Sequence, residues 1–109
     1  MTVNLMEKIG QLIVPRLDIH DRKADLSYAE YLIRDFHIGS FIVFGGDVAR
    51  VVDTLNHLQS ISKDPILFSA DLERGLGQQV KGVTDFPYFI ASPRPQKAAR
   101  LILPMMLPE

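Results

Sequence analysis

The sequence has 109 residues, of which 47% are hydrophobic, 23% charged and 8% aromatic, a composition typical of one folded globular domain. Twelve basic and thirteen acidic side chains give a formal net charge of -1, so we expect neither nucleic acid nor an anionic membrane surface as a partner. The absence of cysteine excludes disulfides, a thiolate nucleophile and a cysteine-ligated zinc site. No signal-peptide pattern and no apolar run of ~20 residues occurs, which predicts a cytoplasmic protein, with a periplasmic location as the alternative.

The first segment predicts a helix followed by a strand. Asn4 can cap a helix over residues 5–11, and Glu7 stands where it completes a capping box. The apolar run over residues 12–17 is broken by Pro15 and Arg16 but contains the β-branched side chains of Ile13 and Val14, which favours a buried strand. The polar residues 18–25 are then expected to form a loop.

A second helix and a second strand follow. Ser27 can cap this helix, and Glu30 can return the capping-box hydrogen bond. Gly39 is expected to end the helix with a positive φ. Residues 40–44 are β-branched and aromatic after the first position, which predicts a central strand covered on both faces. One face of the helix is expected to carry Tyr28, Leu32, Ile33 and Phe36.

The clearest amphipathic pattern begins at Asp47, a good N-cap, and runs to Ser62. A third apolar strand is predicted over residues 65–70, and it leads directly into Asp71. The apolar residues that recur at helical spacing are Val48, Val51, Val52, Leu55, Leu58 and Ile61.

The alternation of strands and helices predicts an α/β fold with a parallel sheet. Three strands leave both sheet edges open, whereas a closed (β/α)₈ barrel needs about 250 residues, so we expect the chain to be incomplete. Five of the seven prolines fall between positions 87 and 108, where they forbid a long helix or a central strand. A truncated or frame-shifted end would account for this region.

The candidate site is the segment SADLERGLGQQVKGVTDFP, residues 69–87. Asp71 directly follows a predicted strand, and in parallel α/β proteins the loops at the carboxyl ends of strands form the site. A carboxylate there can accept hydrogen bonds from hydroxyls, act as a base or bind a metal. The alternative is a structural ion pair in which Arg74 bridges to Asp71 or to Glu73.

Other chemistries have weaker support. Asp71 and Glu73 are too close in sequence to act as the paired carboxylates of a glycosidase, which normally come from different elements. A Mg²⁺ site on these two carboxylates is a weaker alternative, and otherwise we expect no metal and no cofactor. The glycines after Arg74 do not form a nucleotide-binding fingerprint, because Val80 stands where the last glycine belongs. Three histidines have no metal-binding spacing and are expected in solvent or capping roles: His20, His37 and His57.

Four segments occur in the order found in a known enzyme family. They are EKIGQLIVPRLD at residues 7–18, IGSFIVFGG at 38–46, LNHLQSISKDPILFSADLERG at 55–75 and GVTDFP at 82–87. Together they resemble the N-terminal part of family 3 glycoside hydrolases, a group of bacterial β-glucosidases and β-N-acetylhexosaminidases. The resemblance implies a domain over residues 1–91 that contains the first three strand-helix units of an incomplete TIM (β/α)₈-type barrel. Residues 92–109 form an atypical proline-rich tail.

The resemblance also implies a carbohydrate substrate. Members of the family are retaining exo-β-glycosidases, here with β-glucosides or β-N-acetylglucosaminides as expected substrates. Asp71 matches the aspartate that holds sugar hydroxyls, while Glu73 and Arg74 match supporting residues of the same substrate-binding loop, and Arg74 would orient Asp71. Hexosaminidase members usually carry an arginine eight residues after this aspartate, where this chain has Gln79.

The family's nucleophilic aspartate belongs to a late strand and its acid to a later segment, so this chain matches no catalytic residue. We therefore expect the 109-residue chain to be inactive as a hydrolase by itself. The alternative is a non-enzymatic half-barrel that assembles with a partner chain, including another copy of itself, through its open sheet edges.

Overall fold

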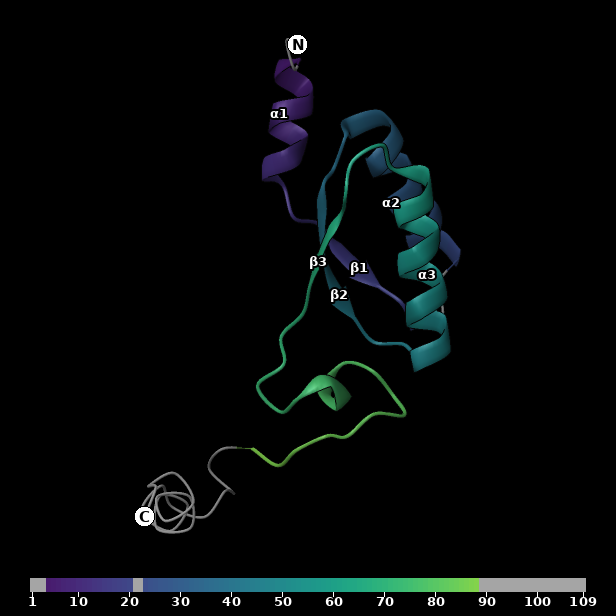
Figure 1. Ribbon diagram of the computed structural model, residues 1–109, viewed down its shortest axis with the longest axis vertical. Coiled ribbons are helices and arrows are strands. Elements are labelled where there is room, and N and C mark those ends of the chain that lie inside the picture. Colours follow the sequence, from purple (N-terminus) through teal and green to yellow (C-terminus); the bar gives the residue numbers. More distant parts are fainter. Residues whose placement is uncertain (1–3, 21–22, 89–109) are drawn as a thin grey trace, which may run out of the picture.

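The computed structural model describes residues 4–20 and 23–88, so the predicted tail over residues 92–109 lies outside the described part. Strands and helices alternate along the described residues (Figure 1). The elements in chain order are α1 (Leu5–Leu12), β1 (Arg16–Asp18), α2 (Lys23–Phe36), β2 (Ser40–Phe44), α3 (Val48–Ile61), β3 (Leu67–Ser69) and the 3₁₀ helix η1 (Leu76–Gln78).

The three strands form one parallel sheet in the order β1-β2-β3, which confirms the predicted α/β class and the parallel pairing. Phe41 of β2 pairs in register with Phe68 of β3, and Val43 pairs with Leu17 of β1. Helices α2 and α3 lie side by side over the same face of the sheet (Figure 1). The prediction that residues 40–44 are covered on both faces is therefore wrong for the described chain, because no described helix packs on the second face.

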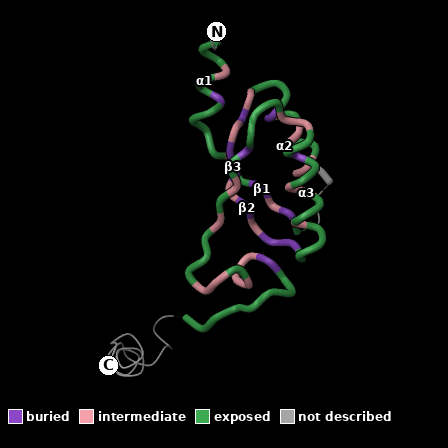
Figure 2. The backbone as a smooth tube through the Cα atoms, in the orientation of Figure 1, coloured by how far each residue is buried: buried purple, intermediate pink, exposed green. Residues whose placement is uncertain are grey.

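The core lies between the sheet and these two helices. Phe41 and Leu58 are fully buried, and Leu17 is 2% exposed. The rings of Phe41 and Phe68 stack with their centroids 6.3 Å apart. Figure 2 shows buried residues along the strands, whereas the segment after β3 is mainly exposed or half-buried. Among the described residues, one covered sheet face thus supplies most of the hydrophobic stabilisation.

Helix α1 has the predicted capping box: the Asn4 N–H donates to Glu7 Oε2 at 3.1 Å, and Asn4 Oδ1 accepts from the Met6 N–H at 3.3 Å. The strand prediction that follows was too long, since β1 starts at Arg16 rather than at residue 12. The first backbone hydrogen bond to β2 is at Pro15, whose carbonyl oxygen accepts from the Ile42 N–H at 3.0 Å. Leu12, Ile13 and Val14 are exposed because they lie before the first residue of β1.

The boundaries of α2 differ from prediction at both ends. The helix begins at Lys23, so Ser27 lies inside it and does not cap it. The residue with positive φ after the helix is His37, at 55°, and not Gly39. Gly39 instead leaves room for the side chain of Gln11, which a Cβ at position 39 would overlap. The Nε2 of Gln11 donates to the His37 carbonyl oxygen at 2.8 Å.

The buried face of α2 was predicted only in part. Ile33 is buried as expected, but Ala29 is the other buried residue of this face. Tyr28 and Phe36 are exposed, and the Phe36 ring lies edge-on to Tyr31 with centroids 5.3 Å apart. The aromatic side chains therefore cluster beside the core rather than inside it.

Helix α3 confirms its predicted N-cap, because Asp47 Oδ1 accepts from the Arg50 N–H at 3.0 Å. Four residues of the predicted stripe contact the core: Leu58 is buried, and Val51, Leu55 and Ile61 are partly buried against it. Val48 and Val52 are exposed, because a helix on one sheet face buries a narrower stripe than the sequence offers.

Leu58→Ala should lower the free energy of unfolding by about 2–5 kcal/mol, because it leaves a cavity in the fully buried centre of the core. Val52→Ala is the matched control on the same helix, and its 50% exposed side chain should make a difference of about 0.5 kcal/mol or less. Urea unfolding followed by circular dichroism measures both. Equal losses in the two variants would contradict this position of the core.

Candidate functional site

The carboxyl ends of the three parallel strands meet at one edge of the sheet, the lower edge in Figure 1. Strand β3 ends at Ser69, so Asp71 stands two residues past the strand, slightly farther than predicted. The segment after Asp71 returns to the same edge, where the Lys81 N–H donates to the Gly46 carbonyl oxygen at 2.9 Å. The strand ends and this returning segment form the candidate site, which we call the carboxyl edge.

Asp71 is exposed at the carboxyl edge. Its backbone carbonyl oxygen accepts from Gln79 Nε2 at 3.2 Å, which gives Gln79 a structural role. Within residues 4–20 and 23–88, no group donates a hydrogen bond to the Asp71 carboxylate and no cation pairs with it. Both carboxylate oxygens can therefore accept hydrogen bonds from a ligand.

Arg74 does not form the ion pair considered from the sequence. Its Nη1 lies 3.4 Å from Asp85 Oδ2, and its guanidinium carbon lies 4.5 Å from the centroid of the Tyr88 ring. The carboxylate of Glu73 accepts instead from Gln78 Nε2 at 2.9 Å. The expected orientation of Asp71 by Arg74 is thus not found among the described contacts, and roles of Glu73 and Arg74 in substrate binding remain predictions.

The glycines of this segment support a tight fold of the backbone. Gly75 has a φ of 80°, and a Cβ there would press against the Phe86 ring. Gly77 donates its N–H to the Thr84 carbonyl oxygen at 3.0 Å, and a Cβ would overlap the backbone of residues 84–85. These glycines allow two stretches of backbone to approach each other closely.

A cluster at the end of β1 was missed by the sequence reasoning. Asp18 Oδ1 lies 2.8 Å from His20 Nδ1 and also accepts from the His20 N–H at 3.1 Å. Asp18 Oδ2 accepts from Arg16 Nη2 at 2.8 Å, and the Arg16 guanidinium lies over the Phe44 ring, 4.8 Å from its centroid. Successive side chains of a strand point to opposite faces of the sheet, and Leu17 and Ile19 lie in the core. This alternation is the sequence signal that could have placed the polar residues together on the other face.

The hydrogen bonds from His20 to the Asp18 carboxylate, with a smaller contribution from Arg16, hold the pKa of Asp18 below its usual value of 3.8. Desolvation opposes this shift but is the smaller effect. Asp18 is therefore ionised and its oxygens are occupied within the protein. His20 is exposed, as one of its two predicted roles required, and it also pairs with this carboxylate.

A cavity of about 310 Å³ lies at the other end of the described fold, between α1 and α2. Its walls are almost entirely apolar and include Ile9, Ile13, Tyr28, Tyr31 and Phe36. It contains no group suited to the chemistry expected of Asp71. Nowhere in the described ranges do three or more potential ligands gather to hold a metal ion, and no helix there is both long and apolar enough to cross a membrane.

No family model matches the sequence. A protein named beta-N-acetylglucosaminidase/beta-glucosidase from Cellulomonas fimi is 35% identical over 78 residues, which are 72% of this chain. The similarity supports a relationship to a glycoside hydrolase. The aligned part is 13% of the relative's length, so the chain spans only a small part of the protein that it matches.

The stability that Asp18 contributes should depend on pH. Because its folded-state pKa is lowered, the contribution is fully present above the unfolded value of 3.8 and is lost as the pH falls through the folded-state pKa. In His20→Ala, carboxyl ¹³C NMR should show the Asp18 pKa rising toward 3.8, since the main cause of the shift is removed. An unchanged Asp18 titration in this variant would contradict the assigned cause.

Proposed function

We propose that this chain forms part of the sugar-binding edge of a glycoside hydrolase barrel and that Asp71 binds hydroxyls of the sugar. The observation that carries the proposal is the exposed Asp71 carboxylate, without an internal partner among the described residues, at the carboxyl edge of a parallel sheet. The similarity to the Cellulomonas fimi enzyme supports the same class of chemistry.

The finer assignment comes from the four motifs. They favour family 3, a TIM-type barrel and a retaining exo-acting enzyme for β-glucosides or β-N-acetylglucosaminides. The described chain alternates strands and helices, and its three strands are parallel and adjacent in chain order. This arrangement is compatible with the start of such a barrel. In this proposal the described sheet face without helices faces the barrel interior.

The chemistry assigned to Asp71 is binding rather than nucleophilic attack. An ionised carboxylate offers two oxygens that can accept hydrogen bonds from neighbouring hydroxyls of one sugar ring. These bonds orient the ring, while attack on the anomeric carbon needs groups that the described residues do not provide. We therefore propose that the chain alone binds a sugar without cleaving it.

Asp71→Ala should abolish sugar binding to the 109-residue chain. Titration of the ¹⁵N-labelled chain with methyl β-D-glucopyranoside, and separately with its 2-acetamido analogue, should shift amide signals around residue 71. Asp64→Ala is the matched control, since Asp64 is an exposed aspartate shortly before β3. Equal shifts in the wild type and Asp71→Ala would remove Asp71 from the site, and no shift in the wild type with either sugar would contradict the proposed function.

A second candidate function is assembly with another chain, favoured by the open geometry of the sheet. Strands β1 and β3 each pair with β2 alone within the described chain, and Leu67 of β3 is 69% exposed on the face without helices. Unpaired strand edges beside an exposed apolar side chain promote association. A second copy of the chain offers the same edges.

If this candidate holds, light scattering after size exclusion should give the mass of a dimer. Leu67→Lys should shift the chain toward the monomer, because it places a charge on the contact face. Leu5→Lys is the control, with a 68% exposed leucine on α1 in the wild type. A wild-type monomer across the concentration range would exclude assembly with itself.

A further inference from the structure

We propose that the imidazole of His20, held by Asp18, is a second sugar-binding group of the carboxyl edge and hydrogen-bonds to a sugar hydroxyl through Nε2. This inference rests on the proposed function, because it names a further residue of the same site. The sequence motifs assign no role to His20, whose position follows from where the strands end.

The sheet register places the two groups at the same edge. Asp18, the last residue of β1, pairs with Phe44, and Ser69, the last residue of β3, pairs with Ile42, so Asp71 follows the end of β3 by two residues at this edge. Strands lie about 4.8 Å apart, so level positions on β1 and β3 are about 10 Å apart. A sugar ring with a hydrogen bond at each side can bridge such a distance, and β2, which ends at Phe44, is the strand between β1 and β3.

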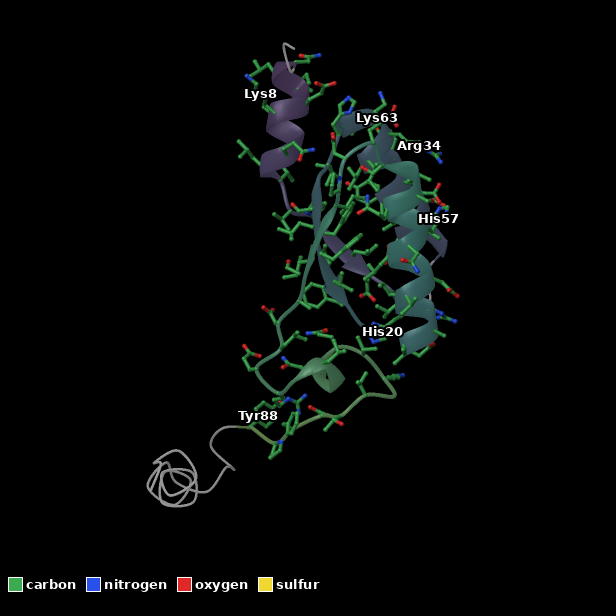
Figure 3. The ribbon with its side chains drawn as sticks, in the orientation of Figure 1. Lys8, His20, Arg34, His57, Lys63 and Tyr88 are labelled. Carbon is green, nitrogen blue, oxygen red and sulfur yellow. The ribbon has the colours of Figure 1, made fainter. Side chains whose placement is uncertain are left out.

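Alternation puts the cluster on the face without helices. Leu17 and Ile19 are in the core, so the side chains of Arg16, Asp18 and His20 belong to the opposite side of the chain. Figure 3 shows His20 at the lower end of the strands, close to the start of α3. This is the edge to which the segment after Asp71 returns through the bond from Lys81 to Gly46.

Three contacts hold His20 in place. Asp18 Oδ1 lies 2.8 Å from Nδ1, and Arg50 Nη1 donates to the His20 carbonyl oxygen at 2.8 Å. The ring also lies against Gly45, where a Cβ would overlap the imidazole. A binding group fixed in this way loses little conformational entropy when a ligand arrives.

The same contacts define which nitrogen can serve the ligand. A carboxylate at Nδ1 favours the tautomer with the proton on that nitrogen, which leaves Nε2 as an acceptor in the neutral ring. None of the described residues bonds to Nε2, and 58% of the side-chain surface is exposed. The oxygens of Asp18 are engaged by His20 and Arg16, so Asp18 is a positioning residue and His20 is the group that touches the sugar.

The chain contains a comparable pair away from this edge. His57 Nε2 lies 2.6 Å from Glu30 Oε1, and the two residues come from α3 and α2. Figure 3 shows His57 on the outer side of α3, at a distance from the strand ends. The pairing with a carboxylate is similar, whereas the position in the fold differs, so His57 provides a matched control.

The test uses the 109-residue chain and methyl β-D-glucopyranoside, followed by ¹⁵N and ¹³C NMR of the histidine rings. The sugar should shift the ring signals of His20 and leave those of His57 unchanged. His20→Ala should weaken binding about threefold to tenfold, the effect of one hydrogen bond. His57→Ala should bind as the wild type does.

A separate measurement tests Asp18 as the positioning residue. In Asp18→Asn the amide can donate to Nδ1, so the ¹⁵N shifts of His20 should show the proton moving to Nε2, and sugar affinity should fall. A purely structural role of Asp18 would leave the sugar affinity unchanged in this variant although the tautomer moves.

The possible failures can be told apart. Binding that is lost in Asp71→Ala but unchanged in His20→Ala overturns the inference while the proposed function stands. Absence of binding to the wild-type chain overturns both.

Discussion

The burial of one face of a parallel three-stranded sheet under two helices is the constraint on which the rest of the structure depends. Phe41, Leu58 and Leu17 are removed from water only if β1, β2 and β3 keep their observed register. In a strand, a shift of one residue would exchange the buried and exposed faces. The same register that protects the core therefore also decides which polar side chains reach the carboxyl edge.

The polar residues on the opposite face follow from this constraint. Because Leu17 and Ile19 point into the core, Arg16 and Asp18 must lie on the other side of β1. There they form a connected set of contacts with His20 and the Phe44 ring. Asp71 differs from this set, since none of the described residues binds its carboxylate. The edge thus combines a pre-organised cluster on one strand with an available carboxylate after another.

The segment after β3 is held by its own backbone contacts. Bonds from Gly77 to Thr84 and from Phe86 to Arg74 close the segment on itself, while Lys81 ties it to Gly46. Arg74 is used within the segment, through Asp85 and Tyr88. Its contacts stabilise the loop that carries Asp71 without neutralising that carboxylate. In this arrangement a residue near a candidate site supports the site indirectly.

The sequence by itself determined the order of helices and strands, the central position of residues 40–44, the caps at Asn4 and Asp47, and the placement of Asp71 after a strand. Each of these follows from local patterns: spacing of apolar residues, capping side chains and β-branched runs. The start of α2, the positive φ at His37 and the exposure of Val48 and Val52 were decided by tertiary packing. So were the partner of Arg74 and the contact between Asp18 and His20. These features depend on which surfaces meet across the fold, and contacts between distant residues leave no periodic signal in a single sequence.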